Sequence, residues 1–336
     1  MTSRPVTELL AQASARVSVR PGDARSSSSF ERVTIDGRGY FLKRLSPSSD
    51  WIMRATGDHV HRPYLVWSAG LMDRVPACID HAVVAMEVVG EGDDAELSVL
   101  MRDVGPQLVP EGDVPVADAQ HRGFLDHLAQ LSVAFWEWTD TVGGLATMAE
   151  RFRFFDASNV ARELAVPDPP GPIVAADEGW RRLPARSPML AEVARAVHEE
   201  PGILAGPLDA TPKTLLHGDW KMGNLGTHPD GRTILIDWAY PGAGPACWDL
   251  CWYLALNRAR LPETKEASIR RFGDALEQHG VPTADWFERQ LDLCTIGIMA
   301  TFGWEKALGD EDELRWWERR VGDAIRRQEI DLPRNR

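Results

Sequence analysis

The stretch from Leu215 to Leu250 limits the possible folds of this chain more than any other part of the sequence. It reads LLHGDWKMGNLGTHPDGRTILIDWAYPGAGPACWDL. An apolar pair is followed by the pattern HxDxKxxN over residues 217–224. The turn residues at 229–231 then predict a two-strand hairpin, whose second strand, TILID, ends on Asp237.

Three oxygen-bearing side chains of this stretch can meet at one point. Asp219 and Asn224 stand five positions apart in a loop. The hairpin then folds back, so that Asp237 is expected to lie close to both. Phosphoryl transfer needs a carboxylate that orients or deprotonates the attacking hydroxyl, and oxygen ligands that hold Mg²⁺ against a triphosphate. A single HxD pattern occurs by chance in many chains. The ordered set, with its hairpin and a second Asp eighteen residues after the first, predicts phosphoryl transfer.

The N-terminal third has the pattern of a small β-rich lobe. From Phe30 onward, ERVTID and YFLKRL form two β-rich runs about a tight turn at residues 37–39, which predicts a hairpin with Lys43 on its second strand. A helical region over residues 50–73, broken near Pro63, precedes two further strands, AVVAMEVV and ELSVLM.

The rest of the chain has helical periodicity. After a polar, proline-containing link, apolar residues recur at spacings of three and four, which is typical of helices packed against a core. The sets are Phe124, Leu128, Leu131, Phe135 and Trp138; Leu190, Val193 and Val197; Ile269, Phe272 and Leu276; and Leu314, Trp317, Val321 and Ile325. We expect a two-lobed α+β fold with a β-rich N-lobe over 1–104, a linker over 105–115 and a mainly helical C-lobe over 116–336.

The amino-acid composition limits the kinds of partner that this chain can bind. The formal charge of -13 argues against a nucleic-acid partner, because binding phosphates needs a surplus of Lys and Arg. The N-terminus lacks the apolar core of a secretory signal, and no stretch reaches the roughly 20 apolar residues of a membrane span. We therefore expect a cytoplasmic protein with no membrane partner; the oligomeric state is left open.

The four cysteines have no paired CxxC spacing, which favours buried thiols over the alternative of a metal site. Most of the thirteen tryptophans lie at helical spacings, which favours core positions over ligand stacking.

The HGD sequence followed by Asn, and IDW where protein kinases carry DFG, resemble the aminoglycoside phosphotransferase family of the kinase-like superfamily. The similarity extends from about Ser26 to Ala307. It implies the protein-kinase-like version of the two-lobed fold, with ATP and Mg²⁺ as cofactors. It also implies transfer of the γ-phosphate to a hydroxyl of a small molecule: an aminoglycoside, amino sugar, sugar or amino alcohol. By the same resemblance Asp219 is the catalytic base, and Asn224 and Asp237 are Mg²⁺ ligands.

The resemblance implies further contacts to the nucleotide. Lys43 would contact the α- and β-phosphates, and Lys221 would act at the catalytic centre by neutralising the γ-phosphate. The segment from Met101 to Val104 resembles the hinge whose backbone contacts adenine, so Met101 and Asp103 are predicted nucleotide contacts.

Two residues are candidates for structural support of the catalytic loop. The resemblance implies that His217 braces the loop through hydrogen bonds, and that Asp249 braces its backbone. For Asp249 the alternative is an ordinary acidic residue at a helix N-terminus, where the macrodipole favours negative charge.

Two features depart from the family pattern. Where a glycine-rich loop would cover the phosphates, the chain has PGDARSSSSFERV, whose Ser27 and Ser28 are candidates for phosphate contact because small residues let backbone amides approach an anion. The helix glutamate that would hold Lys43 is missing, and Asp58 is the acidic candidate in that region. These departures motivate the alternative function, a nucleotide-binding pseudokinase-like module without turnover.

The sequence leaves the acceptor open. The acidic stretch at residues 309–313, together with Trp238, Tyr240 and Trp304, would suit a pocket for a cationic or sugar-like ligand. The alternative, which we favour, is a solvated acidic helix start.

Overall fold

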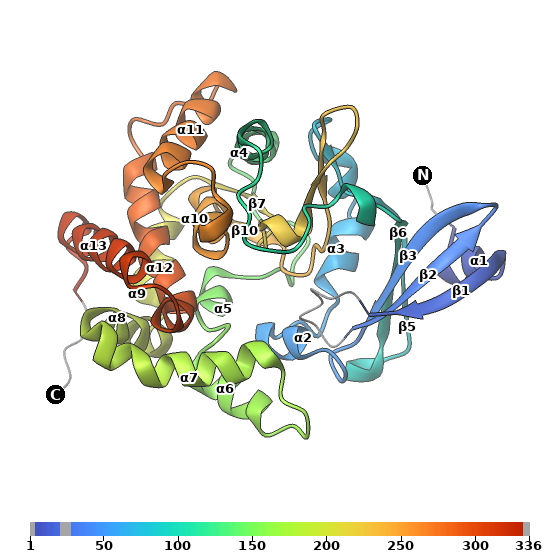
Figure 1. The fold of residues 1–336 in the computed structure, drawn as a ribbon, viewed down its shortest axis with the longest axis horizontal. Coiled ribbons are helices and arrows are strands. Elements are labelled where there is room, and N and C mark those ends of the chain that lie inside the picture. Colours follow the sequence, from blue (N-terminus) through green and yellow to red (C-terminus); the bar gives the residue numbers. More distant parts are fainter. Residues whose placement is uncertain (1–3, 21–27, 332–336) are drawn as a thin grey trace.

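The chain folds into a β-rich lobe and a larger helical lobe in the computed structural model, which describes residues 4–20 and 28–331 (Figure 1). In this part of the chain the first lobe holds a five-stranded antiparallel sheet with the order β1-β2-β3-β6-β5. Its strands are β1 (Ala13–Val19), β2 (Ser29–Ile35), β3 (Arg38–Leu45), β5 (Val83–Val89) and β6 (Glu96–Arg102), and the short helix α1 (Val6–Leu10) packs against the sheet. The predicted α+β, two-lobed architecture, with a β-rich N-lobe and a mainly helical C-lobe, is confirmed.

The hairpin predicted from the tight turn is β2 and β3. Ile35 pairs with Arg38 across a turn in which Gly37 has a φ of 72°, a conformation that favours glycine. Lys43 lies on β3 between Phe30 of β2 and Val99 of β6, as predicted. Strand β1 was not predicted. It is an edge strand with mostly exposed side chains, so it lacks the apolar alternation that identifies a half-buried strand.

The helical region before β5 consists of α2 (Trp51–Thr56), α3 (Arg62–Ser68) and the 3₁₀ turn η1 (Met72–Arg74). The predicted break is confirmed: α2 ends at Gly57 in the left-handed conformation, and Pro63 lies in the first turn of α3, where its missing N–H costs nothing. Figure 1 shows α2 and α3 between the sheet and the helical lobe.

The larger lobe is built around one long buried helix. Every residue of α12 from Gln290 to Trp304 is buried, and α7, α8, α10 and α13 pack around it. The four predicted apolar sets lie on α4, α8, α11 and α13, with Phe135 and Trp138 just past the end of α4. The helices are α4 (Asp118–Ala134), α5 (Met148–Phe152), α6 (Ala157–Leu164), α7 (Gly171–Arg186), α8 (Pro188–Glu199), α9 (Gly202–Asp209), α10 (Cys247–Leu256), α11 (Lys265–Gln278), α12 (Phe287–Leu308) and α13 (Glu311–Gln328).

Short strands carry much of the stretch at residues 215–250 that the sequence analysis singled out. Strand β9 pairs antiparallel with β8 and parallel with β4, while β7 pairs antiparallel with β10. Their bounds are β4 (Ile79–Asp80), β7 (Lys213–Leu216), β8 (Leu225–Thr227), β9 (Thr233–Leu235) and β10 (Gly242–Pro245). The remaining 3₁₀ turns are η2 (Gly92–Asp94), η3 (Gly105–Gln107), η4 (Met222–Asn224) and η5 (Arg258–Arg260). The predicted hairpin before Asp237 is therefore β8 and β9.

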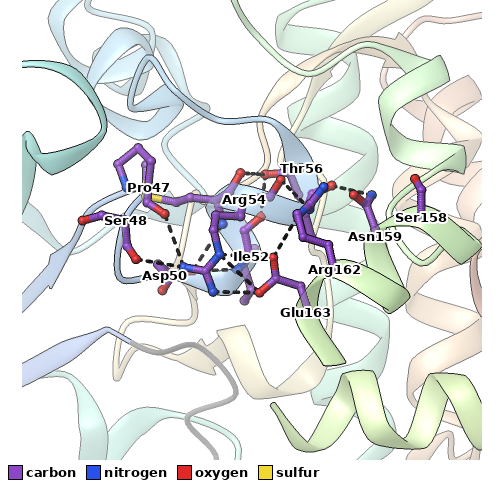
Figure 2. Close-up of polar contacts among 12 residues, drawn as sticks. Pro47, Ser48, Asp50, Ile52, Arg54, Thr56, Ser158, Asn159, Arg162 and Glu163 are labelled. Carbon is purple, nitrogen blue, oxygen red and sulfur yellow. Dashed lines mark hydrogen bonds and ion pairs between the residues drawn. The ribbon is translucent and has the colours of Figure 1, made fainter. Parts of the chain in front are cut away.

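Hydrogen bonds and an ion pair join helix α2 to α6 of the helical lobe (Figure 2). The Arg54 guanidinium donates to the carboxylate of Glu163 on α6 through Nε at 3.1 Å and Nη2 at 2.7 Å, although Glu163 is fully buried. Arg162 donates to the Arg54 carbonyl at 3.0 Å, and Asn159 donates to the Ala55 carbonyl at 2.9 Å. These bonds hold α2 at a fixed place relative to α6.

The tryptophans and cysteines lie mainly in the core. Trp51, Trp220, Trp248 and Trp317 are among the largest fully buried side chains. Within residues 4–20 and 28–331 no group of three or more His, Cys, Asp or Glu side chains is placed to hold a metal ion. None of the helices described is both long enough and apolar enough to span a membrane.

Candidate active site

Helix α10 holds the loop between β7 and β8 in place. Asp249, in the first turn of α10, accepts hydrogen bonds from the backbone N–H groups of His217 at 2.9 Å and Gly218 at 3.0 Å. Burial raises the pKa of the Asp249 carboxyl to about 6, although the Arg151 guanidinium and the two backbone donors oppose this rise. Asp249 thus occupies a helix N-terminus and also contacts the loop backbone.

Gly218 is required by the close approach of this loop to a neighbouring segment. Its φ of 82° lies in the left-handed region, and a Cβ atom at this position would come within 1.9 Å of the Tyr240 carbonyl oxygen. The glycine between His217 and Asp219 therefore lets the loop turn tightly against residues 240–242.

His217 joins the loop to the segment that carries Asp237. Its Nε2–H donates to the Ile236 carbonyl at 3.1 Å, and its Nδ1 accepts from the Asp219 backbone N–H at 3.3 Å. Burial lowers the pKa of His217 to about 4, and the nearby carboxylates of Asp219 and Asp237 only partly oppose this. The imidazole is therefore neutral at pH 7, in the tautomer that these two bonds require.

Asp219 is held by three donors. Its Oδ1 accepts from the indole N–H of Trp252 at 2.8 Å, and its Oδ2 accepts from Lys221 Nζ at 2.7 Å and from Asn224 Nδ2 at 2.8 Å. The Asp219 side chain keeps 16% of its surface exposed. A carboxylate fixed in this way can accept a proton at its exposed edge without rotating.

Asn224 and Asp237 are brought together by the backbone. The Ile236 N–H donates to the Asn224 carbonyl at 3.0 Å, immediately before Asp237. Because the Asn224 amide nitrogen donates to Asp219, its side-chain oxygen is the atom available to a cation. Asp237 has a φ of 62°, which turns the chain sharply after β9, and its carboxylate is about one-third exposed. These two oxygen donors fit Mg²⁺, which usually takes few protein ligands and completes its octahedron with phosphate and water.

Lys43 reaches this group from the β-rich lobe. Its Nζ donates to Asp237 Oδ1 at 2.7 Å. Burial lowers the pKa of Lys43, but the carboxylates of Asp237 and Asp50 outweigh burial and leave the pKa raised. The same ion pair leaves the pKa of Asp237 lowered despite the opposing effect of its burial. Both groups are charged at neutral pH.

Asp50 is a site residue that the sequence reasoning missed. It caps α2 by accepting from the backbone N–H groups of Ile52 at 2.8 Å and Met53 at 3.3 Å, and it also accepts from Ser28 Oγ at 2.8 Å. Its carboxylate therefore lies between the start of α2, the segment before β2 and the ammonium of Lys43. An Asp immediately before a helical pattern is an N-cap signal, which could have drawn attention to this position.

Asp58, the acidic candidate for the partner of Lys43, does not pair with it. The Asp58 carboxylate accepts from the backbone N–H groups of Val60 at 3.2 Å and Arg62 at 3.1 Å, so it caps the start of α3. Lys43 instead pairs with Asp237. The short polar segment between α2 and α3 uses Asp58 for its own backbone, which the spacing of acidic residues does not reveal.

The structure places only some of the predicted nucleotide-binding residues near Lys43 and Asp237. Met101 lines an inner cavity between the lobes together with Lys43, Asp237 and Trp238. Asp103 lies beyond β6, where its carboxylate is 3.4 Å from the Arg32 guanidinium. Ser28 is placed by its bond to Asp50, whereas Ser27 lies outside the described residues.

The acidic stretch at residues 309–313 lies at the N-terminus of α13. Asp310 caps this helix by accepting from the backbone N–H groups of Asp312 and Glu313. Glu313 is buried and accepts from the Trp317 indole at 2.7 Å. Residues 309–312 are exposed, as expected of a solvated acidic helix start, whereas Glu313 is buried and departs from that interpretation.

Two further residues near Asp219 were not singled out from the sequence. Arg151 of α5 is fully buried, and its guanidinium lies 4.5 Å from the centre of the Tyr240 ring. It lies beside Gly218 of the loop between β7 and β8 and opposes the rise in the pKa of Asp249. Trp252 of α10 contacts Asp219 directly. Both lie far from the loop in sequence, and helical periodicity identifies them only as core residues.

Comparison with known proteins connects this geometry to a family. The model of the phosphotransferase enzyme family, abbreviated APH, matches residues 19–286. No curated protein matches the chain closely enough to be counted as a relative.

Solved structures share the fold at low sequence identity. Aminoglycoside phosphotransferase APH(4)-Ia aligns with a TM-score of 0.51 and 17% identity, over 96% of this chain and 96% of that chain. A microcompartment-associated aminopropanol kinase aligns with a TM-score of 0.51 and 14% identity, over 97% of this chain and 98% of that chain. At these identities the likeness concerns the fold.

Proposed function

Because the chain belongs to the phosphotransferase enzyme family and is a kinase of small molecules, we propose that it transfers the γ-phosphate of ATP to a hydroxyl group of a small acceptor, with Mg²⁺ as the metal. We further propose that Asp219 is the catalytic base. The observation that carries this is the fixed, partly exposed Asp219 carboxylate, which lies in one hydrogen-bonded group with Lys221 and Asn224.

Each residue of the site would have its own role in phosphoryl transfer. Asp219 would accept the proton of the acceptor hydroxyl, while Lys221 would lie against the oxygens of the γ-phosphate. Asn224 and Asp237 would hold Mg²⁺, which when bound neutralises charge on the triphosphate. Lys43, already charged and buried beside Asp237, would contact the α- and β-phosphates, and His217 and Asp249 would keep the loop in place.

The acceptor class remains wider than one substrate. The structures that share the fold are named for an aminoglycoside and for aminopropanol, which are both hydroxylated amines. We propose an acceptor of this class, or a sugar or amino sugar, and we include all of these in the test.

The test is ADP release from Mg·ATP in the presence of a panel of aminoglycosides, amino sugars, sugars and amino alcohols. We expect one acceptor class to raise ADP release well above the acceptor-free rate, with the phosphate ester identified by mass spectrometry. Mg²⁺-dependent binding of a non-hydrolysable ATP analogue, without ADP release for any acceptor, would instead support the pseudokinase-like module.

A further inference from the structure

The indole of Trp252 contacts the carboxylate that we assign as the catalytic base. Trp252 lies on α10, is 2% exposed, and donates its Nε1–H to Asp219 Oδ1 at 2.8 Å. The other two donors, Lys221 and Asn224, both go to Oδ2. The two oxygens of Asp219 are therefore held in different ways.

This difference selects one oxygen for proton transfer. A carboxylate oxygen has two lone pairs in its plane. On Oδ2 both are taken, by Lys221 and Asn224. On Oδ1 the indole takes one and leaves the other for a hydroxyl group.

Burial alone does not explain the bond between Trp252 and Asp219. A buried indole N–H usually finds an acceptor, so a bond that merely satisfied the donor would be the simplest explanation. In the described part of the chain, however, the indole N–H groups of Trp220, Trp238, Trp248 and Trp304 are buried without a protein acceptor. In this fold a buried indole therefore need not have a protein acceptor, and burial by itself does not account for the bond between Trp252 and Asp219.

The position of Trp252 is fixed by its neighbours. Its ring packs edge-on against Phe302 of α12, with ring centres 4.7 Å apart, and contacts Trp248 one turn earlier on α10. The same helix carries Asp249, which holds the loop backbone at His217 and Gly218. One rigid helix thus fixes both the backbone and the carboxylate of the catalytic loop.

We propose that Trp252 is a positioning residue that fixes Asp219 so that Oδ1 receives the proton of the acceptor hydroxyl. This rests on the proposed function of Asp219. In the step, the acceptor O–H bond breaks and its proton moves to Oδ1. The acceptor oxygen forms a bond to the γ-phosphorus, the bond from that phosphorus to the β-phosphate oxygen breaks, and ADP leaves.

The test compares two Trp→Phe substitutions that each remove a buried indole–carboxylate bond. Trp252→Phe keeps an aromatic ring but removes the donor to Asp219, and Trp317→Phe is the matched control because it removes the buried indole bond to Glu313 on α13. With Mg·ATP and the panel acceptor of highest turnover, we expect Trp252→Phe to lower kcat by ~10- to 100-fold and to leave KM for Mg·ATP within about twofold. Trp317→Phe should keep both constants within about twofold.

A second measurement keeps the proposal testable if Trp252→Phe folds poorly. The indole ¹⁵N–¹H resonance of Trp252, assigned in the wild-type protein by triple-resonance experiments, should shift in Asp219→Asn but not in exposed Asp285→Asn. Wild-type kcat in folded Trp252→Phe, an equal loss in Trp317→Phe, or an unshifted resonance in Asp219→Asn each overturns the positioning role. A wild-type protein that releases no ADP with any acceptor overturns the proposed function as well, which separates the two failures.

Discussion

At the scale of single residues, the charges of the site depend on pairs that form across the two lobes. Lys43 comes from β3 and Asp237 from the segment after β9, and their ammonium and carboxylate groups meet at 2.7 Å. The sequence motif predicts each residue separately, because each stands at a recognisable place in a strand or loop. The partners Asp50 and Trp252 were not predicted, since their contacts depend on how distant helices pack rather than on local spacing.

For Asp237→Asn we expect weaker Mg·ATP binding, because the substitution removes the anionic ligand that would hold the metal against the triphosphate. The half-saturating Mg²⁺ concentration for turnover should rise by about tenfold or more. ADP release measured over a range of Mg²⁺ concentrations gives this value, and calorimetric titration of a non-hydrolysable ATP analogue at several Mg²⁺ concentrations checks the binding. An unchanged Mg²⁺ dependence would remove Asp237 from the metal site.

Lys43→Met should weaken nucleotide binding and also lower kcat, since a charged contact that strengthens toward the transition state aligns the γ-phosphate. Asp58→Asn provides the control because Asp58 caps α3 and does not contact Lys43. We expect Asp58→Asn to lower thermal stability with little effect on KM for Mg·ATP. A defect in Asp58→Asn that copies the Lys43→Met defect would restore Asp58 as the partner.

At the scale of elements, most of the fold could be predicted because apolar periodicity identifies helices and the central hairpin. Strand β1 was missed because an exposed edge strand has little such periodicity. The fastening of α2 to α6 was also missed, because Arg54 and Glu163 are 109 positions apart and neither belongs to a motif. The division into lobes at residues 104 and 116 stays a prediction.

Breaking the link between α2 and α6 should cost stability. Glu163→Gln leaves the Arg54 guanidinium without its carboxylate, and because Glu163 is fully buried while Arg54 is about one-quarter exposed, we expect a loss of about 2–4 kcal/mol. Urea unfolding measures the change. The control is Glu178→Gln, which breaks an exposed pair with Arg182 on α7 and should change the unfolding free energy by under about 0.5 kcal/mol. Equal effects in the two variants would contradict the importance of this link.

At the scale of the whole molecule, two buried groups, His217 in the loop after β7 and Asp249 on α10, give opposite pH dependences of stability. The folded pKa of His217 is lowered to about 4, so protonation favours unfolding and stability is lost as pH falls from about 6.5 toward 4. The folded pKa of Asp249 is raised to about 6, so stability is gained as pH falls from about 6 toward the unfolded value of about 3.9. The two contributions largely offset each other over this range.

Asp249→Asn should expose the uncompensated effect of His217. Because the variant lacks the gain that Asp249 supplies, its unfolding free energy should fall by about 2 kcal/mol more than that of the wild type between pH 6.5 and 4.5. Urea unfolding at several pH values measures the two profiles, with exposed Asp285→Asn as the control. Parallel profiles for Asp249→Asn and the wild type would show that the Asp249 carboxyl has no raised pKa in the folded protein.

The central claim is that the fixed Asp219 carboxylate accepts the proton of the hydroxyl that attacks ATP. The most direct measurement compares turnover and nucleotide binding in Asp219→Asn with those of the wild type, with Mg·ATP and the best acceptor of the panel. We predict a fall in kcat of about 10³-fold or more, with the Kd for a non-hydrolysable Mg·ATP analogue within about threefold. Turnover near the wild-type rate, or a loss explained entirely by weaker nucleotide binding, would contradict this account.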